Sequence, residues 1–105
     1  MKYPYYTGLN LKLVPKNSEE PEIYLAKIVY LTSEHICIEL PVRVDGGRYG
    51  FFPNGTELEA SFVGIDNTLY RFPSTVLGRK KASKPLLLIS HPEPDQIERK
   101  QRRNY

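Results

Sequence analysis

The chain has 105 residues, of which 40% are hydrophobic and 11% aromatic, and its formal net charge is +3. This length suits one small domain with a single core, and the hydrophobic content excludes a wholly disordered chain. The single cysteine, Cys37, excludes an internal disulfide, and the first residues do not follow a signal-peptide pattern. Apolar runs fall far short of the roughly 20 residues that a membrane-spanning helix needs. We therefore expect a cytoplasmic protein without membrane insertion.

The first half of the chain reads as three strands. Residues 8–14 alternate apolar and polar side chains before Pro15, and residues 35–40 alternate in the same way. Residues 23–31 are apolar on both faces, which is typical of a central or curved strand. Cys37 is expected on the face opposite to its apolar neighbours. The side chains predicted to point into the core are Leu9, Leu11, Leu13, Ile36, Ile38 and Leu40.

The second half begins with a glycine-rich segment, residues 45–55, which we interpret as a loop with at most a short strand. Residues 57–63 and 68–72 then form a predicted hairpin, with Leu58, Ala60 and Phe62 pointing inward. Pro73 cannot donate a ladder hydrogen bond, so we expect a bend or bulge there before the strand continues. Residues 85–90 are nearly all apolar, which indicates a strand buried on both faces.

About six short strands separated by turns predict an all-β barrel or sandwich. After the last strand, residues 95–98 allow two interpretations. Asp95 could cap a short helical turn with Glu98 at its third position, or the segment could be an extended linker.

The chain offers little material for catalysis or metal binding. His35 and His91 are far apart without a cysteine or carboxylate at ligand spacing, and Cys37 lies in an apolar strand. Glu57 and Glu59 share a strand face, but alternation makes that face solvent-exposed. The glycines match no phosphate-binding loop. We therefore predict a protein that is not an enzyme and has no metal or cofactor.

Two further groups of residues allow a binding role or a structural one. The basic run of residues 79–84 could contact phosphates, but a solvated loop tip is the favoured interpretation. Tyr3, Tyr5 and Tyr6 could form a stacking surface, but packing of the first strand onto the barrel is favoured.

Positive charge is concentrated at the end of the chain. Residues 1–77 carry seven basic and nine acidic side chains, a net charge of −2, whereas residues 78–105 carry eight basic and three acidic ones, a net charge of +5. Arg99, Arg102 and Arg103 lie within five positions of one another. Guanidinium groups grip phosphate with two hydrogen bonds and stack on purines, which suits a guanine nucleotide. A basic tail that is merely solvated is the alternative.

The order of these features resembles the N-terminal domain of YcgR-type flagellar brake proteins. The shared features are the Gly8-x-Leu-x-Leu strand, the loop between Pro41 and Gly55, Tyr70-Arg71-Phe72, and Pro85-Leu86-Leu87-Leu88 followed by His91-Pro92. The final Gln101-Arg102-Arg103-Asn104-Tyr105 is similar to the start of the R-x-x-x-R motif that introduces a PilZ domain.

The resemblance implies a small split β-barrel of about six or seven antiparallel strands in residues 1–92. Residues 93–105 would then be a basic interdomain linker with the start of the PilZ motif, and the PilZ domain itself would follow. Arg103 would be the first motif arginine and Arg102 its neighbour. Arg99 and Arg103 also have R-x-x-x-R spacing, but the Gln-Arg-Arg-x-Tyr frame favours the first alignment.

In such proteins cyclic di-GMP binds between the two domains, and a D/N-x-S-x-x-G motif of the PilZ barrel completes the site. That motif is missing from these 105 residues, so we expect them to bind the nucleotide weakly or not at all. The implied partners are cyclic di-GMP, the downstream PilZ domain and flagellar motor or stator proteins, with recruitment to the motor.

Two other function classes remain open at this point. Split barrels also occur in flavin oxidoreductases, although fold alone does not determine function; a colourless protein would exclude this class. A nucleic-acid-binding domain would use residues 79–84 and the tail, and its affinity would fall steeply with salt. We do not expect nucleic acid as a partner.

Overall fold

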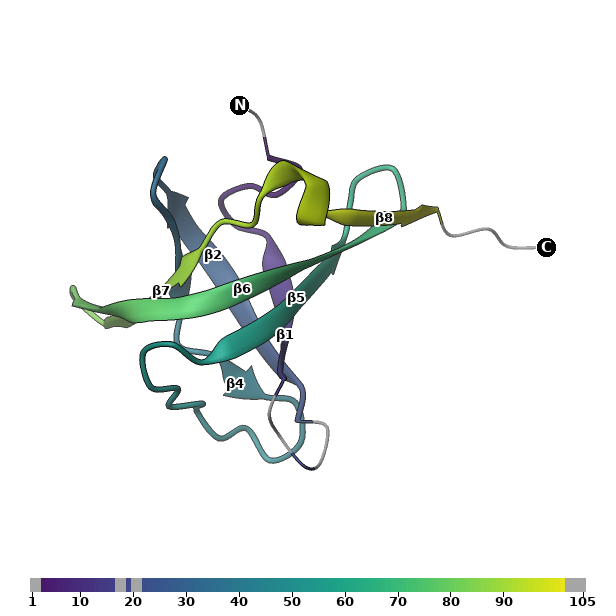
Figure 1. Cartoon of the computed structure of the whole chain (residues 1–105). Helices are drawn as coiled ribbons and strands as arrows, with labels where there is room; N and C mark the ends of the chain where they lie inside the picture. The colour runs from purple at the N-terminus through teal and green to yellow at the C-terminus, as the bar shows by residue number, and fades with distance from the viewer. Residues whose placement is uncertain (1–2, 17–18, 20–21, 102–105) are drawn as a thin grey trace.

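The computed structural model of the chain describes residues 3–16, 19 and 22–101, and these form a strongly twisted β structure (Figure 1). The strands and the one short 3-10 helix of this part are β1 (Asn10–Pro15), β2 (Tyr24–Leu31), β3 (His35–Glu39), β4 (Val42–Arg43), β5 (Glu57–Val63), β6 (Thr68–Lys81), β7 (Pro85–Ser90), η1 (Pro94–Gln96) and β8 (Glu98–Gln101).

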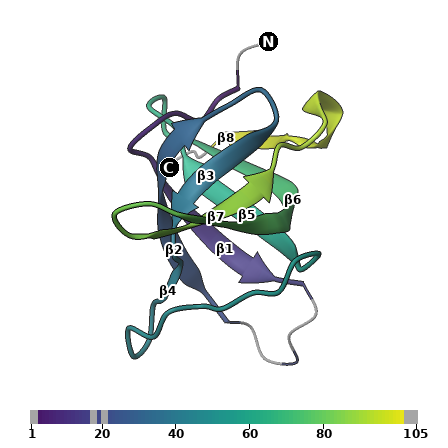
Figure 2. The same cartoon turned by 90° about the vertical axis from the view of Figure 1, so that its left-hand side faces the viewer.

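Six of these strands close into a barrel. The pairing order is β1-β5-β6-β7-β3-β2, and β2 pairs again with β1, so the sheet returns to its starting strand. All neighbouring pairs are antiparallel, and the short β4 and β8 extend the sheet beside β2 and β6. Figure 2 shows the barrel turned by 90°. Closure removes most exposed strand edges, and the all-β barrel predicted from the sequence is confirmed.

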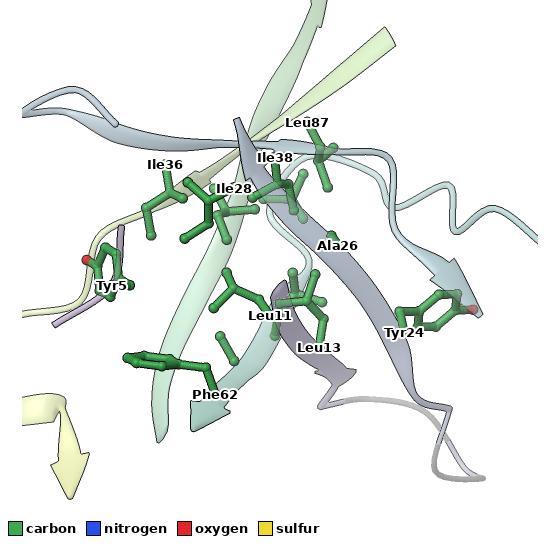
Figure 3. Packing of buried hydrophobic residues seen from close by; sticks show 14 of the residues in the cluster. Tyr5, Leu11, Leu13, Tyr24, Ala26, Ile28, Ile36, Ile38, Phe62 and Leu87 are labelled. Atoms are coloured by element: carbon green, nitrogen blue, oxygen red, sulfur yellow. The ribbon is translucent and has the colours of Figure 1, made fainter. Parts of the chain in front are cut away.

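The barrel interior is filled by the alternating apolar residues of its strands (Figure 3). Burying one such side chain contributes roughly 1.5–3 kcal/mol, so this set accounts for most of the favourable free energy of folding. Of the residues predicted to point inward, those buried to 4% exposure or less are Leu11, Leu13, Ile36, Ile38, Leu58, Ala60 and Phe62. Leu9 and Leu40 are partly buried against the same cluster.

Two strands differ in detail from the prediction. β2 has partners on both edges, as expected of a central strand, but Leu25 faces outward and is 48% exposed. Cys37 is fully buried, although it points away from Ile36 and Ile38. It lies opposite Leu88 of β7, and this neighbour covers the outer face of β3 at that point.

The predicted bend or bulge does not appear as a bulge at Pro73, because β6 runs from Thr68 to Lys81 and keeps its register with β5 through Pro73. Pro73 lies between the stretch of β6 that pairs with β8 and the stretch that pairs with β7. The amide of Thr75 donates to Oγ of Ser90 on that edge, and backbone nitrogens two residues apart point the same way along a strand. Pro73 therefore loses no ladder bond, and the register shift falls between Val76 and Gly78 instead.

The segment after β7 combines the two predicted possibilities. Pro94–Gln96 forms a single 3-10 turn, and the chain then extends as β8. The expected cap at Asp95 was wrong: the backbone amide of Glu93 donates to Oε1 of Gln96 at 2.9 Å, so the cap lies two positions earlier. Pro94 favours this because proline suits the first position of a helix. The predicted change from barrel to linker after residue 92 stays a prediction.

Tyr3 and Tyr5 pack onto the barrel, which agrees with the interpretation favoured from the sequence. Tyr5 is 2% exposed and stacks on Phe72, with ring centroids 5.1 Å apart. Tyr3 stacks on His91 at 4.2 Å. These rings close one end of the barrel, whereas Tyr6 is 43% exposed.

Candidate functional site

β8 positions the first of the predicted ligand-binding arginines. It runs antiparallel to the start of β6, with Arg99 opposite Tyr70. Ile97, just before β8, packs against the core and anchors the strand. The Arg99 side chain is 67% exposed, so β8 fixes its backbone while leaving the guanidinium accessible. Arg102 and Arg103 lie outside the residues that the structure describes.

Arg99 makes one long ion pair with the turn between β5 and β6. Its Nη2 lies 3.7 Å from Oδ2 of Asp66. The Asp66 carboxylate accepts a hydrogen bond from the backbone amide of Thr68 at 3.1 Å. Hydrogen bonding from Thr68, with a smaller contribution from Arg99, lowers the pKa of Asp66 below its usual value. Exposed ion pairs of this kind contribute little to stability, so Arg99 can exchange this carboxylate for a phosphate at small cost.

Arg71 joins three strands beneath Arg99. From β6, its Nη2 lies 2.7 Å from Oε2 of Glu98 on β8, and its Nε lies 3.3 Å from Oε1 of Glu59 on β5. The hydrogen bond to Glu98 and the charges of both glutamates raise the pKa of Arg71. Arg71 therefore helps to hold β8 in place. No local sequence pattern indicates its partner Glu98, 27 positions away.

A shallow groove runs along this edge of the sheet, with a cavity volume of about 450 Å³. Its lining residues are Leu69, Arg71, Glu98, Arg99 and Lys100. Three of the five carry a positive charge, and all of them belong to β6 or β8. Such an open, cationic strand pair can contact phosphate oxygens from one side. This groove is open on one side and does not enclose a ligand.

The basic run at the tip of the β6–β7 hairpin is tied to the barrel more closely than a solvated loop would be. Nζ of Lys80 lies 3.0 Å from the hydroxyl of Tyr30 and also over its ring. Lys84 forms an ion pair with Glu39. These basic groups therefore interact with the barrel wall, although all of them remain exposed.

The residues considered for catalysis have structural roles. Within the described ranges, histidine, cysteine and carboxylate side chains form no group of three that could hold a metal ion. His91 accepts a hydrogen bond from the hydroxyl of Tyr5. Cys37 is buried, and Glu59 forms an ion pair with Arg71. In that same part of the chain, helices long and apolar enough to span a membrane are absent.

Together, these observations define a small closed antiparallel β-barrel with an exposed arginine on the added strand β8. Residues 7–92 match the family model PilZNR, described as flagellar protein YcgR. The chain belongs to this family, which comprises the N-terminal domains of YcgR-type proteins.

Two proteins of Bacillus subtilis are similar to this chain. One is the uncharacterized protein YpfA of strain 168, which is 34% identical over 89 residues, covering 83% of this chain and 41% of YpfA. The solved structure is that of the inhibitor of motility MotI/DgrA, with a TM-score of 0.84 and 30% identity over 96% of this chain and 48% of MotI. The chain thus spans less than half the length of either protein.

Proposed function

We propose that this domain is the regulatory module of a cyclic di-GMP receptor that controls bacterial motility. The observation that carries the proposal is the family match over residues 7–92, combined with the exposed Arg99 on a strand that leads directly into Arg102 and Arg103. The similar protein MotI/DgrA is an inhibitor of motility. The protein would act in the cytoplasm, without catalysis, on flagellar motor or stator proteins.

In this proposal, the arginines form one half of the nucleotide site. Arg99 is presented by β8 beside Lys100, and Arg102 and Arg103 follow within four positions of Arg99. Their guanidinium groups would bind the two phosphates and stack on the guanines. A PilZ domain following residue 105 would supply the other half, consistent with a groove that is open on one side. Closing this site would change how the two domains face each other.

Calorimetry with cyclic di-GMP on the full-length gene product tests this proposal. Saturable binding is expected, and Arg103→Ala should weaken it at least tenfold, corresponding to about 1.4 kcal/mol. Arg102→Ala and Arg99→Ala should weaken it too. Arg79→Ala is the matched control, because Arg79 is an exposed arginine on the β6–β7 hairpin and is not one of the three predicted site arginines. Its loss should leave the affinity for cyclic di-GMP unchanged.

A full-length protein that releases no binding heat, or that binds equally well after Arg103→Ala, would refute the nucleotide site. The same variants give a biological readout in swimming assays on soft agar. Overproduction of the wild-type protein should reduce swimming when cyclic di-GMP is abundant, and Arg103→Ala should restore it. Swimming that is unaffected by the wild-type protein would refute the motility role.

A further inference from the structure

An apolar groove lies between β2 and the loop that follows β4. Its cavity volume is about 620 Å³. Three of its lining side chains are large, apolar and exposed: Leu25 at 48%, Tyr49 at 59% and Phe51 at 70%. Exposed apolar side chains scattered singly are ordinary, whereas a contiguous group around a hollow marks an interaction site.

The loop that presents Tyr49 and Phe51 is firmly held. Gly50, between them, donates its amide to the carbonyl of Pro41 at 2.8 Å. The next residue, Phe52, is 7% exposed and packs edge-on against Tyr24. Phe52 is thus buried while its neighbour Phe51 is exposed. A surface that is already fixed loses little entropy when it binds a partner.

Three basic side chains lie in or beside this groove. Lys27 and Lys84 line it, and the guanidinium of Arg79 lies 5.9 Å from the centre of the Phe51 ring. The only acidic side chain among the lining residues is Glu39, and Lys84 already pairs with it. An apolar centre with a cationic rim is complementary to an acidic partner with an apolar anchor.

We propose that this groove docks an acidic protein segment that inserts an apolar side chain between Leu25, Tyr49 and Phe51. A second copy of the chain fits the charges poorly, because a two-fold interface would place the same cations opposite one another. β4, whose following loop borders the groove, lies far from β8 in both views (Figures 1 and 2). The groove and the predicted nucleotide site use different lining residues, so the proposal does not rest on the nucleotide site.

Titration of the isotope-labelled 105-residue chain with synthetic peptides tests the proposal. The probe is a short peptide in which glutamates flank a central Phe-Leu pair, and the comparison peptide carries Ser-Gly at the centre. Saturable binding of the first peptide should shift the amide resonances of Leu25, Tyr49 and Phe51. Phe51→Ser should weaken it about tenfold, as expected for an anchor residue, and added salt should weaken it further.

Ile65→Ser is the matched control, because Ile65 is 92% exposed in the turn between β5 and β6, far from the groove. It removes a large exposed apolar side chain and should leave affinity unchanged. Equal binding of both peptides, shifts confined to other strands, or an equal loss in Ile65→Ser would overturn the proposal. So would dimerisation through the groove, or binding to phosphatidylglycerol vesicles with no peptide affinity. None of these outcomes depends on cyclic di-GMP.

Discussion

The hydroxyl of Tyr5 donates a hydrogen bond to Nδ1 of His91 at 2.6 Å, across 86 positions of sequence. The direction of this bond follows from the other ring nitrogen. Nε2 of His91 lies 2.7 Å from the carbonyl oxygen of Thr32, and a carbonyl can only accept, so Nε2 carries the proton. The pair joins the first segment of the chain to the residues that follow β7.

Tyr5→Phe should destabilise the domain by about 1 kcal/mol, because it removes a hydrogen bond and leaves Nδ1 of His91 without this donor. Urea unfolding at neutral pH, followed by circular dichroism, measures the change. Tyr6→Phe removes a hydroxyl from a side chain that is 43% exposed, and it should change stability little. Equal effects of the two substitutions would contradict the role assigned to the Tyr5–His91 bond.

Tyr5 also makes the domain sensitive to alkaline pH. Burial, with a smaller effect of Tyr3, raises the pKa of Tyr5 well above its ordinary value. Above a pH of about 10 an unfolded tyrosine ionises while the folded one does not, so the unfolded state gains stability. The stability due to Tyr5 is complete below that pH and should fall as the pH rises further. The loss of unfolding free energy at alkaline pH should be smaller in Tyr5→Phe, as measured by urea unfolding in alkaline buffers. Identical pH profiles of the two proteins would contradict this role of Tyr5.

Gly50 is required by the packing of the loop. A Cβ at this position would lie 2.8 Å from Cε2 of Tyr24 and 2.9 Å from Cζ of Phe52, both closer than real contacts allow. Gly50→Ala should therefore cost about 1–3 kcal/mol through displaced rings. Gly78→Ala is the matched control, since a Cβ there has no atom within 4 Å. Thermal unfolding of both variants should show a lower midpoint for the first alone.

Much of the barrel could be predicted because alternation is a local property. Leu11, Leu13, Ile36 and Ile38 were assigned to the interior from period-two patterns, and all are 0% exposed. Cys37 breaks the pattern, because its burial depends on a strand that arrives 50 residues later. The burial of Cys37 can be predicted only when the order of the strands in the sheet is known.

In the candidate site too, some features could be predicted from the local sequence and others depend on distant strands. Arg99 was singled out from residue type and spacing, but its place on a strand beside β6 was not foreseen. β8 forms because Ile97 reaches the core and Arg71 meets Glu98. Neither contact has a signature in the local sequence, since each joins segments about 25 residues or more apart. A basic linker and a basic edge strand have similar sequences, and only the strand pairing distinguishes them.

Glu98→Gln should loosen β8 while leaving the barrel intact. It keeps the size of the side chain but removes the charge that pairs with Arg71 at 2.7 Å. Exposed ion pairs are worth about 0.2–1 kcal/mol, so amide exchange in β8 should accelerate by up to roughly fivefold. Hydrogen exchange followed by NMR measures this strand by strand. Glu57→Gln, on an exposed glutamate of β5, should leave β8 unchanged; similar acceleration in both variants would show that the Arg71 pair does not anchor β8.

Phe72→Ala and Phe51→Ala should separate the fold from the proposed docking surface. Phe72 is 1% exposed and stacks on Tyr5, so its truncation leaves a cavity and should cost about 3–5 kcal/mol. Phe51 is 70% exposed, and losing its ring should change the unfolding free energy by less than about 0.5 kcal/mol. Urea unfolding of the two variants provides the comparison. A large loss of stability in Phe51→Ala would mean that this ring supports the loop rather than facing a partner, and reduced peptide binding in that variant could no longer be assigned to a lost contact.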